Sequence, residues 1–143
     1  MEELEALRKM VEDHDYSAAL TLIDEMDEMA KDDKIVKVIS FLGVLLVHLI
    51  KQKAEKRSTT SWERSINHSL RGIAQTNKRR SSGGYYLKNE ELTNAIEEAF
   101  QYALKEAADE AFGGAYSAKI LSKMIDMDII KKEALELILN YDA

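Results

Sequence analysis

The chain has 143 residues, 45% hydrophobic and 32% charged, with a formal net charge of −6, a composition that excludes a disordered chain and fits one globular domain. It contains no cysteine, which excludes disulfides and thiolate metal sites and fits a cytoplasmic protein. Its most apolar stretch falls short of the ~20 residues that a membrane span needs, so we expect no membrane partner.

The N-terminal part of the chain predicts two helices. Residues 2–12 place leucine, methionine and valine side chains on one stripe, as an amphipathic helix does. His14 and Asp15 interrupt this pattern. A second helical pattern covers residues 16–30, with Glu25 at the edge of its apolar stripe.

The longest apolar stretch predicts a central helix. Asp32 and Asp33 provide an acidic start, which the positive end of a helix favours, so the helix is expected at about residues 33–55. Residues 35–50 are apolar on most sides, which indicates a helix surrounded by others.

The next predicted helix covers residues 62–77 and is amphipathic. Thr60 and Glu63 have the spacing of a capping box at its start. A wheel of 100° per residue places an apolar set inward: Trp62, Ile66, Leu70 and Ile73. The opposite face carries polar side chains: Arg64, His68, Arg71, Gln75 and Lys78.

The C-terminal part predicts a long alanine-rich helix and two short ones. Asn89 is expected to cap the helix of residues 90–111, which packs through small side chains: Ala95, Ala99, Ala103 and Ala107. The glycine pair after Phe112 ends that helix, and residues 117–125 and 128–140 follow as shorter helices. We therefore predict an all-α, single-domain bundle over residues 1–143, with about six to seven helices around the central one.

Three segments in this order resemble a known family. They are LIDEM at residues 22–26, LGVLLVHLIK at residues 42–51, and RSTTSW at residues 57–62, which RGIA follows at residues 71–74. Together they resemble the domain-of-unknown-function 29 family over roughly residues 18–110. The resemblance implies an all-helical bundle and no established activity, so it supplies no catalytic residues.

His48 is a polar residue inside the apolar helix and invites a functional interpretation. With Glu25 and Lys51 it would form a small polar site between two helices, where a carboxylate orients the imidazole. The alternative is a histidine whose nitrogens are satisfied locally. A bundle metal site needs a Glu-x-x-His motif on paired helices, which the chain lacks, so we predict no metal and no cofactor.

Arg64 and His68 invite comparison with the HEPN ribonucleases, small helical bundles that carry Arg-x4–6-His. The spacing here is Arg-x3-His, which misses that motif. Two such residues one helical turn apart are also ordinary for a solvated helix face. We therefore predict no catalytic residues and keep a HEPN-like or metal-assisted nuclease as a lesser alternative.

Charge is distributed unevenly along the chain. Residues 51–80 contain nine bases and two acids, a net charge of +7, whereas the other residues contain 11 bases and 24 acids, a net charge of −13. Such asymmetry favours an anionic partner. The residues expected to contact it are Lys51, Lys53, Lys56, Arg57, Arg64, His68, Arg71, Lys78, Arg79 and Arg80.

These observations favour a binding or regulatory protein over an enzyme. The basic segment of residues 51–80 would contact nucleic acid or another anionic partner through phosphate contacts, largely without regard to sequence. The main alternative is a structural or protein-interaction module, in which acidic and basic faces of two copies pair in a homo-oligomer.

Overall fold

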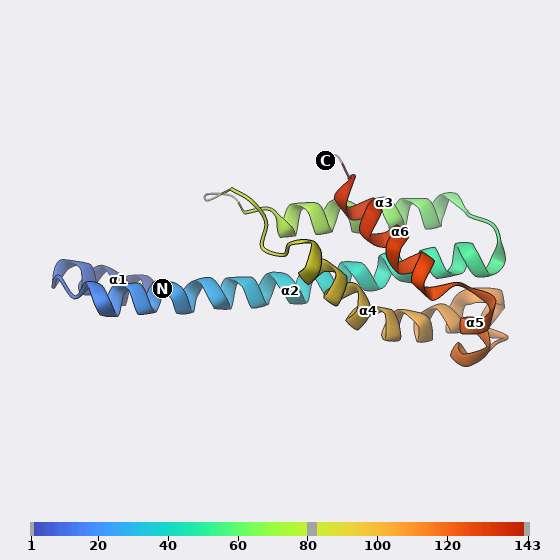
Figure 1. Ribbon diagram of the computed structural model, residues 1–143, viewed down its shortest axis with the longest axis horizontal. Helices are drawn as coiled ribbons and strands as arrows, with labels where there is room; N and C mark the ends of the chain where they lie inside the picture. Colours follow the sequence, from blue (N-terminus) through green and yellow to red (C-terminus); the bar gives the residue numbers. More distant parts are fainter. Residues whose placement is uncertain (1, 80–82, 142–143) are drawn as a thin grey trace. The chain divides into compact units, whose positions relative to one another are not determined.

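A computed structural model of the chain describes residues 2–79 and 83–141, which form an all-helical fold (Figure 1). The α-helices of this part are α1 Glu2–Glu12, α2 Tyr16–Glu55, α3 Thr60–Asn77, α4 Asn89–Glu110, α5 Ala118–Met124 and α6 Met127–Leu139, with a 3₁₀ turn at Ala111–Gly114. The predicted all-α helical bundle is confirmed. Within these residues, no helix has the length and apolar character needed to cross a bilayer.

The predicted helix break before residue 33 is wrong, because α2 continues through it for 40 residues. No glycine or proline lies between residues 16 and 42. Asp32 and Asp33 keep their side chains exposed in mid-helix, so their charge costs little there. Acids and lysines four positions apart, such as Asp33 and Lys37, also have a spacing that favours a continuous helix.

Contacts divide the chain into two compact units, and the first ends at Lys34. It contains α1 and the start of α2, joined by a turn at His14, whose φ of 60° is left-handed. The carboxylate of Asp15 then accepts the Ala18 backbone N–H at 3.3 Å and starts α2. Ala19 is the only buried residue among residues 2–34, so this unit has almost no core of its own.

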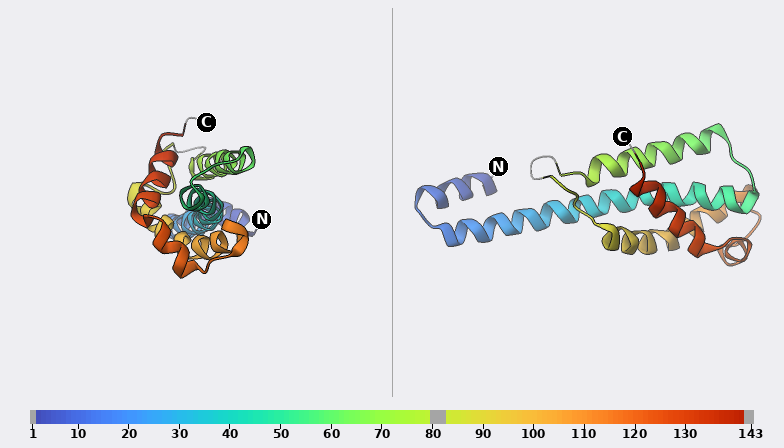
Figure 2. Two further views of the ribbon diagram at one scale, coloured as in Figure 1. Left: turned by 90° about the vertical axis from the view of Figure 1, so that its right-hand side faces the viewer. Right: turned by 45° about the horizontal axis from the view of Figure 1, so that its top comes forward.

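The second unit begins at Ile35 and contains the hydrophobic core. Figure 2 shows the C-terminal half of α2 in its centre, with α3, α4 and α6 around it. The α2 side chains with less than 2% exposure are Val38, Leu42, Leu45, Leu46, Leu49 and Ile50. Helix α3 runs back beside α2, α4 packs against α5 and α6, and α6 also contacts α3. Buried side chains cover a broad side of α2 in this unit, whereas Val36 and Val44 are exposed, so other helices surround the predicted central helix only in part.

The helix faces agree with the sequence, but two caps differ by one residue. Thr59 caps α3, because its hydroxyl accepts the Trp62 backbone N–H at 3.1 Å, whereas Thr60 is the first helical residue. Similarly, Lys88 precedes α4 and Asn89 is its first residue. The alanine face of α4 is buried as predicted: Ala95, Ala99, Ala103 and Ala107.

Candidate functional site

The outer face of α3 carries exposed basic side chains, as predicted. Arg64 and Arg71 lie seven residues apart on this face, and Lys78 follows at the end of the helix. In the part of the chain that the structure describes, none of the three has an ion-pair partner. We call Arg64, His68, Arg71 and Lys78 the α3 basic face.

The α3 basic face is held on α2 by close packing. The imidazole of His68 meets the ring of Phe41 edge-on, with 6.4 Å between ring centroids. One turn away, Gly72 faces the same ring, and a Cβ at this position would overlap it. Glycine therefore allows α3 to approach α2 closely enough for this contact.

The N-terminal part of the predicted basic segment is instead neutralised within the chain. Lys51 Nζ lies 2.9 Å from Glu110 Oε1, and Lys53 Nζ lies 3.3 Å from Glu133 Oε2. Arg57 Nε lies 2.9 Å from Glu55 Oε1. These three bases therefore contribute less to an anion-binding surface than the sequence implied.

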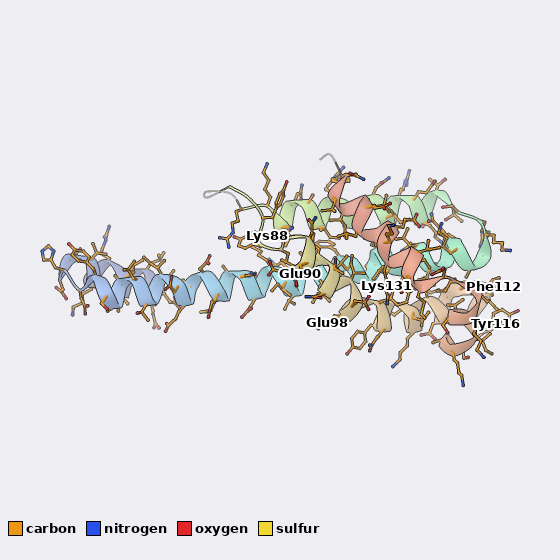
Figure 3. The ribbon with its side chains drawn as sticks, viewed as in Figure 1. Lys88, Glu90, Glu98, Phe112, Tyr116 and Lys131 are labelled. Carbon is orange, nitrogen blue, oxygen red and sulfur yellow. The ribbon has the colours of Figure 1, made fainter. Side chains whose placement is uncertain are left out.

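Lys51 and Arg57 also enclose Trp62. Lys51 Nζ lies 4.6 Å and Arg57 Cζ 4.7 Å from the centre of the indole ring, both within the range of cation–π attraction. Trp62 is 9% exposed. Phe112, labelled in Figure 3, donates its backbone N–H to Glu55 Oε2 at 3.3 Å and links the end of α4 to the end of α2. These contacts join the helix ends and leave the indole little room to stack on a ligand.

The remaining residues of the predicted basic segment differ in their surroundings. Lys56 is exposed just after α2. The guanidinium of Arg79 lies over the ring of Tyr86, with Cζ 4.5 Å from its centre. Arg80 lies outside the described residues.

Glu25, His48 and Lys51 all belong to the single helix α2, whereas the polar site was expected between two helices. His48 Nδ1 lies 2.8 Å from the carbonyl oxygen of Val44, so this nitrogen has its partner within the same helix. Over the described ranges, histidine and carboxylate side chains form no cluster of three that would hold a metal ion.

Asn77 is a site residue that sequence reasoning missed. It is 5% exposed, and its amide makes two hydrogen bonds with the backbone of Leu87. Asn77 Nδ2 donates to the carbonyl oxygen at 3.0 Å, and the Leu87 N–H donates to Oδ1 at 2.7 Å. An asparagine at a helix end ordinarily indicates an exposed turn, so no sequence signal identified this contact.

Asn77 and Leu87 also line a cavity of about 890 Å³. It lies where the end of α3, the segment before α4, the start of α4 and the end of α6 meet. We call it the α3–α6 cavity.

Comparison with known protein families identifies a match for most of the chain. The family model described as "Domain of unknown function DUF29" matches residues 2–126 of the 143-residue chain. No curated protein and no solved structure matches the chain. The match extends beyond residues 18–110, where the resemblance was noted.

Proposed function

The chain belongs to the DUF29 family, a domain of unknown function, so its own surface has to carry the assignment, and we propose that it is a non-enzymatic nucleic-acid-binding protein. The α3 basic face contacts the phosphates, and the protein acts in the cytoplasm. The observation that carries this proposal is that Arg64, Arg71 and Lys78 are exposed without ion-pair partners in residues 2–79 and 83–141.

The spacing of these cations supports contact with a phosphate backbone. A rise of 1.5 Å per residue separates Arg64 from Arg71 by roughly 10 Å along the helix. A nucleic-acid strand offers several phosphates over that length. Such contacts neutralise charge and read no bases, so binding is salt-dependent and similar for different sequences.

The test is fluorescence anisotropy with labelled single-stranded RNA and duplex DNA, titrated at several salt concentrations. Replacing Arg64 and Arg71 with glutamine should weaken binding about tenfold for every sequence and lower the salt slope by up to about 2. Lys119→Gln with Lys123→Gln is the matched control, because it removes the same charge from exposed positions on α5.

Three outcomes contradict this proposal. Wild-type protein that does not bind at low salt excludes nucleic acid as the partner. If the α3 and α5 variants weaken nucleic-acid binding equally, binding depends only on the net charge of the protein and not on the α3 basic face. If the protein cleaves the RNA and His68→Ala abolishes this cleavage, the protein is a nuclease and not a non-enzymatic binding protein.

A second candidate function, protein interaction, rests on the first unit. Large apolar side chains are exposed there, including Tyr16 at 57%, Leu20 at 62% and Met29 at 63%. Residues 1–34 contain 12 acids and four bases, a net charge of −8. A helix pair with one buried residue gains stability when another protein surface covers it.

Light scattering at low and high salt tests whether that surface belongs to a second copy. A dimer held by acidic and basic faces should dissociate as salt screens the charges. A dimer held by the exposed apolar side chains should persist at high salt. A monomer under both conditions rules out the homo-oligomer.

A further inference from the structure

The α3–α6 cavity has the size of a small-molecule site. Its volume of about 890 Å³ falls within the range of typical ligand pockets. Its lining comes from α3, α4, α6 and the segment between α3 and α4. The α3 basic face shares only Lys78 with it, so the two sites can be tested separately.

The cavity has an apolar wall that core packing holds in place. Ile73, Leu87 and Leu92 underlie it as core residues, each 3% exposed or less, whereas Leu139 is 47% exposed and supplies apolar surface that a ligand can reach. Ile138 contributes from α6 and packs against the same core. Because the core holds Ile138 in place, this side chain needs little further ordering when a ligand binds.

Asn77 fixes the segment that supplies Leu87. Besides its two amide hydrogen bonds with Leu87, its backbone carbonyl accepts the Tyr86 N–H at 2.9 Å. Further along the same segment, the Arg79 N–H donates to the carbonyl of Gly84 at 3.0 Å. These hydrogen bonds hold Leu87 and Tyr86 against the end of α3, at the edge of the cavity.

The polar groups of the cavity favour an anion. Lys78 and Lys88 are exposed and line it from two sides, and Glu90 is the one carboxylate among its lining residues. Figure 3 labels Lys88 and Glu90 at the start of α4. Two ammonium groups against one carboxylate leave a net positive charge beside the apolar wall.

We propose that the α3–α6 cavity binds a small amphipathic organic acid. The apolar chain or ring of the ligand lies against Ile138 and Leu139, above the buried side chains of Ile73, Leu87 and Leu92, and its carboxylate lies near Lys88 and Lys78. The two proposed sites share Lys78, and Lys88 distinguishes them because it lines the cavity and lies outside the α3 basic face.

The experiment is isothermal titration calorimetry of the full chain with octanoate and with octanol. The two probes share an alkyl chain and differ in the charged group. Octanoate should bind with one site per chain and about fivefold more tightly than octanol, because only octanoate can pair with the lysines. Equal affinity would overturn the assigned ligand class, and absence of binding by both probes would overturn the site.

Two variants locate the bound probe. Lys88→Gln should weaken octanoate at least threefold and leave octanol unchanged, whereas Lys119→Gln on α5 should affect neither probe. Ala74→Phe adds a ring at a residue that lines the cavity and should abolish binding of both probes. Octanoate affinity that is unchanged in Lys88→Gln, or in a folded Ala74→Phe protein, would place the probe elsewhere and overturn the proposal.

Discussion

The ammonium group of Lys51 lies 2.9 Å from a carboxylate oxygen of Glu110 and joins the C-terminal part of α2 to the end of α4. The Lys51 side chain is 8% exposed, whereas that of Glu110 is 50% exposed. The stability of the charged lysine therefore depends on this contact. If the carboxylate is lost, little water can reach the ammonium group to solvate it in its place.

Glu110→Gln should lower the free energy of unfolding by about 1–2 kcal/mol, since it leaves the Lys51 charge without its carboxylate. Adding Lys51→Met should restore part of this loss, because methionine occupies a similar volume without a charge. Urea denaturation measures both variants.

The control for this prediction is Glu133→Gln. Its partner Lys53 is 48% exposed, and exposed ion pairs contribute about 0–1 kcal/mol. A loss in Glu133→Gln as large as that in Glu110→Gln would show that the burial of Lys51 is not the cause.

The cap of α3 gives a prediction that separates two adjacent threonines. Thr59→Ala should destabilise the protein by about 1 kcal/mol, because the Trp62 N–H loses its acceptor. Thr60→Ala should be neutral or slightly stabilising, because Thr60 is already helical and alanine favours a helix. Thermal unfolding of the two variants measures the difference. A larger loss of stability in Thr60→Ala than in Thr59→Ala would mean that Thr60 caps the helix, as the sequence indicated.

Asn77 should be among the most sensitive polar positions of the chain. Asn77→Ala leaves the buried N–H and carbonyl of Leu87 without partners, which should cost about 2–3 kcal/mol in urea denaturation. The exposed Asn94 on α4 provides the control, and Asn94→Ala should change stability by less than about 0.5 kcal/mol. Similar values for both variants would mean that water satisfies Leu87 when Asn77 is lost.

The end of α2 offers a stabilising substitution. Lys56 follows the helix with a φ of 55°, a conformation that suits glycine and strains other residues. Lys56→Gly should therefore raise the free energy of unfolding by about 1 kcal/mol. Lys53→Gly, three residues earlier and inside the helix, should lower it by a similar amount. Destabilisation by both substitutions would show that the Lys56 side chain contributes more to the free energy of unfolding than its strained backbone conformation takes away.

The sequence predicted the helices of the second unit well, because their periodicity is strong. Trp62, Leu70 and Ile73 are buried on α3, while Arg64 and Arg71 are exposed, as a period of 3.6 residues requires. Asp32 and Asp33 misled the prediction for α2, since an acidic pair is equally compatible with a helix start and with the exposed face of a continuing helix.

Contacts between distant segments could not be predicted in the same way. Glu110 lies 59 residues from Lys51, and their pairing depends on which helices meet. The charge count therefore treated Lys51, Lys53 and Arg57 as available to a partner, although all three have carboxylates beside them. The cavity could not be predicted either, because it is the space left between three helices and one segment.

The position of Trp62 makes the two units distinguishable by spectroscopy. It is the only tryptophan of the chain and belongs to the second unit, so its fluorescence reports on that unit and is blind to residues 2–34. Far-ultraviolet circular dichroism, in contrast, follows the helices of both. Coincident melting curves would mean that the units unfold cooperatively, whereas an early loss of ellipticity at constant fluorescence would mean that the first unit melts by itself.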